Sequence, residues 1–174
     1  GAVGKGYAVK KCKEAMKRVG IENAMVKAGG DLITWGKMGN SPWSIGISNP
    51  NDKKTVFSWL EIGETAVSTS GNYEHFVIID SVRYSHIINP KTGYPSRGVK
   101  SATIICSDPE LSDALSTSVF ILGIDQALGL VNQLKGINCI LFDDNNQIHS
   151  SNGINLNYYQ PDDIRQKHAL IIGK

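Results

Sequence analysis

The chain has 174 residues, of which 41% are hydrophobic and 20% are charged, as is typical of a globular protein. This length is sufficient for a single domain, spanning residues 1–174, with a core that needs neither disulfides nor structural zinc. The 18 basic and 16 acidic residues give a net charge of +2, far from the clustered positive charge that nucleic-acid binding requires. No apolar run approaches the roughly 18 residues of a membrane span. We therefore expect neither a nucleic-acid partner nor a transmembrane segment in this chain.

Hydrophobic spacing predicts one helix and then several strands in the first third of the chain. Apolar residues recur with a helical period from Gly6 to Val19, which indicates an amphipathic helix. Residues Ala24 to Trp35 form an apolar run that Gly29-Gly30 interrupts, a pattern typical of strand, sharp turn and strand. Alternating apolar and polar residues at Trp43 to Ile47 and at Val56 to Leu60 predict two further strands, each with one buried face.

The middle of the chain is dominated by predicted strands and one loop. The strands are expected at Ala66 to Ser68, Glu74 to Ile79, Tyr84 to Ile88 and Ala102 to Cys106. The segment from Asn89 to Gly98 is rich in Pro and Gly and is predicted to be a loop.

The remaining third contains two predicted helices and a hairpin. Ser107-Asp108-Pro109-Glu110 supplies a cap, a first-turn proline and an early acid, so a helix should run from there through Phe120. A second helix is expected from Asp125 to Lys135, followed by a hairpin that starts at Asn138 and a last short strand at Ala169 to Ile172. Helix, strands, two helices and hairpin in this order predict an α+β fold.

Asp113 and Thr117 are the first candidates for a metal site. They lie four residues apart in a mostly apolar predicted helix and therefore share one face. A buried carboxylate needs compensation, which a hard cation such as Mg²⁺ could provide by binding one carboxylate and one hydroxyl oxygen. Alternatively, Asp113 points to solvent near the start of the helix, where the helix dipole favours an acid. The pattern alone leaves both interpretations open.

Two glycine-containing segments are candidate ligand-binding turns. The residues Gly1 to Gly6 lead into the first helix and carry Lys5, so they could bring backbone N–H groups and a positive charge to a phosphate. Thr69 to Glu74 combines small hydroxyl residues with Gly71, which suits close approach of the backbone to a ligand. A flexible helix entry and a plain β-turn explain these segments about equally well.

His86 is the candidate general base. It ends a predicted strand and precedes a loop that Pro90 and Pro95 stiffen, so the loop can hold side chains at little entropic cost. The pKa range of histidine suits general-base catalysis. The other histidines, at positions 75, 149 and 168, are expected to be structural or exposed. Cys12, Cys106 and Cys139 match neither a zinc nor a disulfide spacing and are expected to be buried thiols.

Five motifs in order resemble those of the FAD:protein FMN transferases, the ApbE family. They are Gly1 to Ala8, Ala28 to Asp31, Thr69 to Tyr73, His86 to Pro95 and Ser112 to Thr117. The resemblance covers Gly1 to about Gly153 and implies a T-fold-like α+β architecture, mostly antiparallel sheet with packed helices. It also implies FAD as substrate, Mg²⁺ as cofactor, and transfer of FMN to a Thr or Ser hydroxyl of an acceptor flavoprotein, with release of AMP.

The resemblance also implies residue roles. Metal ligands would be Asp113, Thr117, Ser116 and the backbone carbonyl of Ala2, with Asp113 and His86 as the catalytic residues. FAD would contact Lys5, Gly6, Thr69, Ser70, Gly71, His86 and Ile87, the last through its backbone. His86 matches the histidine that deprotonates the acceptor hydroxyl.

Two departures from the family pattern stand out. Asn89 lies where the family usually has Asp, which removes a charge beside His86. The family's N-terminal half is absent, so the chain is expected to be a C-terminal portion that packs against a missing N-terminal part. The family resemblance suggests a bacterial cell envelope or periplasmic location. Two alternatives to FMN transfer stay open: Mg²⁺-dependent hydrolysis of FAD to FMN and AMP, and a non-catalytic flavin-binding fragment.

Overall fold

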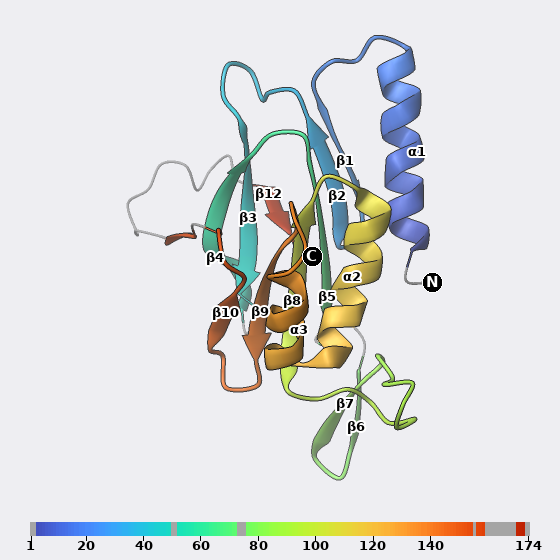
Figure 1. The fold of residues 1–174 in the computed structure, drawn as a ribbon, viewed down its shortest axis with the longest axis vertical. Helices are drawn as coiled ribbons and strands as arrows, with labels where there is room; N and C mark the ends of the chain where they lie inside the picture. Colours follow the sequence, from blue (N-terminus) through green and yellow to red (C-terminus); the bar gives the residue numbers. More distant parts are fainter. Residues whose placement is uncertain (1–2, 50–51, 73–75, 155, 159–169, 173–174) are drawn as a thin grey trace.

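The computed structural model describes residues 3–49, 52–72, 76–154, 156–158 and 170–172 (Figure 1). The described residues form three helices, α1 Gly4–Arg18, α2 Pro109–Leu122 and α3 Ile124–Val131. The strands are β1 Ala24–Ala28, β2 Asp31–Trp35, β3 Trp43–Asn49, β4 Asp52–Ile62, β5 Thr65–Gly71, β6 Phe76–Ile79, β7 Val82–Ser85, β8 Val99–Cys106, β9 Asn138–Asp143, β10 Ile148–Ser150, β11 Asn157–Tyr158 and β12 Leu170–Ile172.

The strands form one large sheet and two smaller ones. The largest has the order β1-β2-β5-β8-β9-β10, and every neighbouring pair in it is antiparallel. A four-stranded sheet has the order β11-β4-β3-β12, in which only the β12–β3 pair is parallel. The β6–β7 hairpin forms a separate ribbon at the lower end of the molecule (Figure 1).

The six-stranded sheet is the middle of three layers. Alternate residues of β9 face opposite sides, because Cβ atoms alternate along a strand. Cys139 and Leu141 pack with α2 and α3, whereas Ile140 and Phe142 pack toward β3 and β4. Helix α1 packs beside α2 and covers β1 and β2, with Val9 buried in that contact (Figure 1). The central strands are therefore buried on both faces, and the helices lie on one side of them.

Most predicted elements are confirmed. The α+β class, the first two helices, the glycine turn between β1 and β2, and the β9–β10 hairpin are present. Gly29 has a φ of +60°, a conformation that glycine adopts without the steric cost of a Cβ. The last predicted strand, Ala169 to Ile172, corresponds to β12, and its position 169 lies outside the described residues. The same is true of positions 74 and 75 in the strand predicted before β7.

Three predictions are corrected. Cys12 is exposed, because it lies on the outward side of α1, whereas Cys106 and Cys139 are buried as expected. The strand predicted from Tyr84 to Ile88 ends at Ser85, since the Ile87 N–H turns back to the Ser85 hydroxyl. The last helix ends at Val131 instead of Lys135, because the following N–H groups bond in tighter turns, such as that of Leu134 to the Val131 carbonyl.

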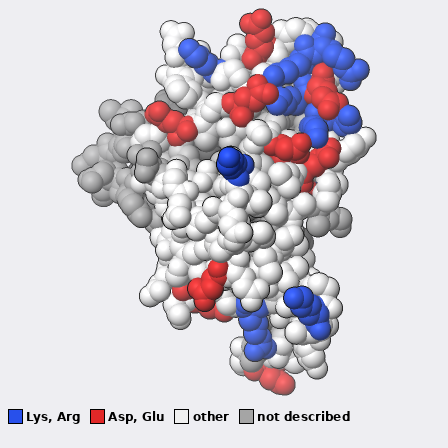
Figure 2. All heavy atoms as spheres, in the orientation of Figure 1, with Lys and Arg blue, Asp and Glu red and all other residues white. Residues whose placement is uncertain are grey.

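Charged side chains of both signs are interleaved over α1 on the face seen in Figure 2. Ion pairs explain the arrangement: Lys11 contacts Glu14, and both Lys13 and Lys17 contact Glu64. The basic residues that the sequence places along α1 are therefore partly neutralised. Among the described helices, none is long and apolar enough to cross a membrane.

Candidate functional site

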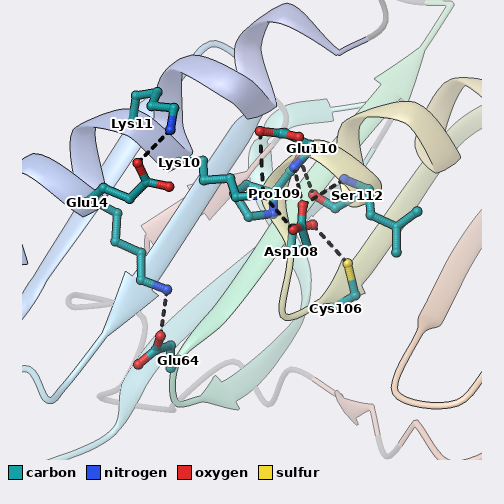
Figure 3. A network of polar contacts seen from close by, with 11 residues as sticks. Lys10, Lys11, Glu14, Glu64, Cys106, Asp108, Pro109, Glu110 and Ser112 are labelled. Carbon is teal, nitrogen blue, oxygen red and sulfur yellow. Dashed lines mark hydrogen bonds and ion pairs between the residues drawn. The ribbon is translucent and has the colours of Figure 1, made fainter.

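The start of α2 is fixed by a side-chain cap and by α1. Oδ1 of Asp108 accepts hydrogen bonds from the N–H groups of Glu110 at 2.8 Å and Leu111 at 3.1 Å. Lys10 of α1 places its Nζ 2.9 Å from Oδ2 of Asp108 (Figure 3). The hydrogen bond from Lys10 holds the pKa of Asp108 below its usual range. The two helices are thereby tied together one turn before Asp113.

Gly6 allows α1 and α2 to cross in close contact. A Cβ at position 6 would lie 2.2 Å from the carbonyl oxygen of Pro109, which is a steric clash with the backbone. The close approach lets the Gly6 N–H donate a 2.9 Å hydrogen bond to Oδ2 of Asp113. Asp113 is only 1% exposed. Asp113 is therefore buried and does not point to solvent.

Lys5 connects Asp113 with a second buried carboxylate. Its Nζ lies 3.1 Å from Oδ1 of Asp113 and 2.9 Å from Oδ2 of Asp31, the first residue of β2. Desolvation acts to lower the pKa of Lys5, but hydrogen bonding and attraction to the two carboxylates raise it overall. One ammonium therefore lies between two carboxylates, and the three side chains carry a net negative charge.

Asp31 is compensated less well than Asp113. It is 1% exposed, and neither of its carboxylate oxygens has a hydrogen-bond partner within the part of the chain that the structure describes. Its contact with Lys5 is an ion pair in which Nζ lies 2.9 Å from Oδ2. Burial raises the pKa of Asp31, and Lys5 opposes the increase. A buried carboxylate oxygen without a hydrogen bond is costly unless a cation or donor reaches it.

Hydroxyl groups join α2 to β5 beside these carboxylates. Ser70 Oγ lies 2.8 Å from Ser116 Oγ and 3.2 Å from Thr117 Oγ1. Ser68 and Ser112 make the equivalent contact at 2.6 Å, one turn earlier in α2. The neighbouring β1–β2 turn also packs on β5, since a Cβ at Gly30 would lie 2.9 Å from the Thr69 carbonyl oxygen. The end of β5 is thus a row of small side chains.

His86 lies on the other side of the cleft, where β7 has ended, and is exposed. The next residue, Ile87, is buried, and its carbonyl accepts a 2.8 Å hydrogen bond from Ser96 N–H. The Ile87 N–H also has a partner, because it donates a hydrogen bond to Ser85 Oγ. A ligand can therefore contact the Ile87 backbone through the second lone pair of its carbonyl oxygen. Backbone hydrogen bonds between Asn89 and Tyr94 close the loop.

These elements enclose a cleft of about 330 Å³. It is lined by Lys5, Gly30, Thr69, Ser70, Gly71, His86, Ile87, Ile88, Asp113, Thr117 and Ile121. Eight of the predicted site residues are in that set. Gly6 and Ser116 lie directly behind the lining and hold Asp113 and Ser70, whereas Ala2 lies outside the described residues. Segments far apart in the chain are therefore brought together in one cleft.

Two residues at the site, Asp31 and Ile121, were not predicted from the sequence. Ile121 contributes an apolar wall at the end of α2 that faces the His86 loop. The sequence does contain a signal for the burial of Asp31. The residue lies between a Gly-Gly turn and the apolar run Leu32-Ile33, so it must be buried with its strand. That signal predicts burial but gives no partner for the charge.

Solved structures show the class of protein to which this fold belongs. The ApbE protein of Thermotoga maritima superposes with a TM-score of 0.80 at 35% identity, over 87% of this chain and 50% of its own. The flavinyl transferase ApbE of Pseudomonas stutzeri gives 0.75 at 29% identity, over 87% and 48%. The architecture is therefore that of the α+β proteins represented by a flavinyl transferase.

Sequence comparison identifies the family. The model described as "ApbE family" matches residues 1–141, and this chain belongs to the ApbE family. An FAD:protein FMN transferase of Vibrio cholerae is 33% identical over 147 residues, 82% of this chain and 44% of that protein. One of Escherichia coli K12 is 34% identical over 134 residues, 75% of this chain and 38% of that protein. The chain spans less than half the length of these relatives.

Proposed function

We propose that this chain carries the metal and acceptor side of a Mg²⁺-dependent FAD:protein FMN transferase. The supporting observation is one cleft that is lined by a buried carboxylate, Asp113, together with Lys5 and His86. Relatives of this chain are named FAD:protein FMN transferases, and this name indicates flavin transfer as the reaction. The cleft contains side chains that suit that reaction. We further propose that the acceptor is a flavoprotein with a Thr or Ser hydroxyl and that AMP is released.

The donor set of the cleft fits Mg²⁺. Asp113 provides a carboxylate, and Thr117 and Ser116 provide hydroxyl oxygens one turn further along α2. Such all-oxygen donors suit a hard cation that keeps several waters and binds substrate phosphates. Two carboxylates against one ammonium also leave an excess of buried negative charge, which a cation would neutralise. When bound, Mg²⁺ would supply charge neutralisation to the pyrophosphate of FAD.

The residues around the metal position would bind the pyrophosphate. Lys5 carries the positive charge nearest to Asp113, and its half-exposed side chain can reach a phosphate in the cleft. Thr69 to Gly71 present small side chains and hydroxyl donors along the same wall. Binding here would orient the FMN phosphorus toward the end of the cleft that contains His86.

His86 would act on the acceptor. Its imidazole would take the proton from the acceptor hydroxyl, while that oxygen attacks the FMN phosphorus and the bond from phosphorus to the bridging oxygen of AMP breaks. AMP leaves with the electron pair, and FMN stays bound to the acceptor through a phosphoester. The exposed position of His86 at the cleft is compatible with access by a large acceptor.

The same exposure favours a second candidate, hydrolysis of FAD to FMN and AMP. Water can reach an exposed His86 as readily as a protein hydroxyl can, and activation by the same base would give free FMN. No different residue is needed for this reaction.

One assay separates these functions. The chain is incubated with FAD, Mg²⁺ and a flavoprotein that carries an acceptor Thr, alongside the matched Thr→Val acceptor. Mass spectrometry then measures covalent FMN on the acceptor, and chromatography measures free FMN and AMP. Covalent FMN on the Thr acceptor alone supports the transferase. Free FMN and AMP without adduct support hydrolysis, and neither product indicates a non-catalytic flavin-binding chain.

A further inference from the structure

The two carboxylate oxygens of Asp113 have different partners. Oδ2 accepts the Gly6 N–H and so forms part of the contact between α1 and α2. Oδ1 accepts a 3.1 Å hydrogen bond from Lys5 Nζ. Oδ1 is therefore the oxygen that can turn to a divalent cation without loss of the helix contact. An ammonium and a divalent cation beside one oxygen repel each other, so Lys5 would have to withdraw from Oδ1.

Asp31 is suited to receive the withdrawn ammonium. Its Oδ2 already lies 2.9 Å from Lys5 Nζ. Both of its oxygens are buried, and neither accepts a hydrogen bond from any residue that the structure describes. The Lys5 side chain is 49% exposed, so it has space to move. A small rotation of the Lys5 side chain would replace the ion pair that it shares with both carboxylates by a hydrogen-bonded pair with Asp31 alone.

We propose that Asp31 is a positioning residue that takes the whole Lys5 ammonium when a divalent cation binds Asp113. The proposal rests on the metal site of the proposed function. It explains why a second carboxylate is buried beside the cleft and shares the Lys5 ammonium with Asp113. It also keeps the positive charge of Lys5 inside the cleft, where a pyrophosphate would bind, and prevents it from competing for the metal ligand.

A double-mutant cycle on cation binding tests this exchange without FAD. Binding of Mn²⁺, which takes the same oxygen ligands as Mg²⁺, is measured by electron paramagnetic resonance on the wild-type chain, Asp31→Asn, Lys5→Met and the double variant. We expect Asp31→Asn to weaken Mn²⁺ binding by about tenfold while Lys5 is present, because Lys5 then has only Asp113 to pair with. With Lys5→Met in the background, the same Asp31→Asn change should cost less than about threefold.

Three results would overturn the proposal. An equal loss in both backgrounds would mean that Asp31 acts on the cation directly, through its charge or as a ligand. An unchanged affinity in Asp31→Asn would mean that Lys5 needs no second partner. Absence of Mn²⁺ binding in Lys5→Met, the variant with least competition, would remove the cation site itself.

Controls separate a local effect from misfolding and from failure of the proposed function. Asp125→Asn removes an exposed acid on α3 and should leave Mn²⁺ affinity unchanged. Thermal unfolding of each variant shows whether the fold is kept, and Asp31→Glu should restore part of the affinity because it can still accept the ammonium. If flavin transfer is absent but the coupling between Asp31 and Lys5 is found, the exchange stands and only the transferase proposal fails.

Discussion

The backbone N–H of Gly6 donates a 2.9 Å hydrogen bond to Oδ2 of Asp113, 107 residues away in the chain. A carboxylate on α2 is thus oriented by the main chain of α1, and the missing side chain of Gly6 is what permits the approach. The geometry of the proposed metal ligand consequently depends on how closely two helices pack.

Gly6→Ala should therefore destabilise the chain. The added Cβ would meet the Pro109 carbonyl oxygen at 2.2 Å, so the helices must separate, and the free energy of unfolding should fall by about 3 kcal/mol. Urea denaturation followed by circular dichroism measures the change. Gly4→Ala is the matched control, because nothing lies within 4 Å of its Cβ, and it should change stability by less than about 1 kcal/mol. Equal effects of the two variants would contradict the close packing at Gly6.

Asp113→Asn should lower FMN transfer by about 1,000-fold, since several kcal/mol of charge stabilisation by the metal are lost. The amide keeps the size of the side chain, so the fold should survive. Rates are measured against Mg²⁺ concentration, with Asp125→Asn as the control for loss of an acid elsewhere. A variant that keeps the wild-type rate and Mg²⁺ dependence would exclude Asp113 as a metal ligand.

His86→Gln should reduce transfer by about 100- to 10,000-fold, the usual contribution of a general base. Its side chain is exposed, so the free energy of unfolding should change little. Single-turnover transfer and equilibrium titration with FAD separate the chemical step from binding. His149→Gln is a comparison at a histidine that contacts Asp143 away from the cleft, and it should leave the rate unaltered. Full activity of His86→Gln would assign the proton transfer to another group.

Asp108 should make stability depend on acidic pH. Its pKa is depressed in the folded chain by Lys10 and by the N–H groups that it caps, so its contribution is present above the unfolded pKa and is lost as pH falls through the folded pKa. Asp108→Ala should cost about 1 kcal/mol at neutral pH, as is usual for loss of a helix cap. Asp108→Asn keeps a capping oxygen but not the charge, so it should cost less. Urea unfolding between neutral and strongly acidic pH should show the wild-type advantage over Asp108→Asn shrink in acid, and a constant difference would refute the linkage.

Much of the fold could be predicted from the sequence because the signals that specify these elements are local. The helical period of α1, the cap at Asp108, the Gly29-Gly30 turn and the β9–β10 hairpin each depend on residues a few positions apart. The errors arose where an apolar residue was not buried and where a local hydrogen bond ended an element early. Cys12 has an apolar side chain but lies on the outward side of α1, and the Ser85 hydroxyl turns the chain before His86.

The sequence by itself determined which residue types were available to the site, namely a carboxylate, hydroxyls, a lysine and a histidine in five ordered motifs. It could not determine whether Asp113 was buried or solvated, nor that Asp31 would share Lys5 with it. Those relationships join α1, β2 and α2, and they exist only because the helices pack on the sheet and exclude water there. Burial makes the free energy of each charged group depend on the groups beside it. Where those groups are this distant in the sequence, tertiary structure alone determines which of them are neighbours.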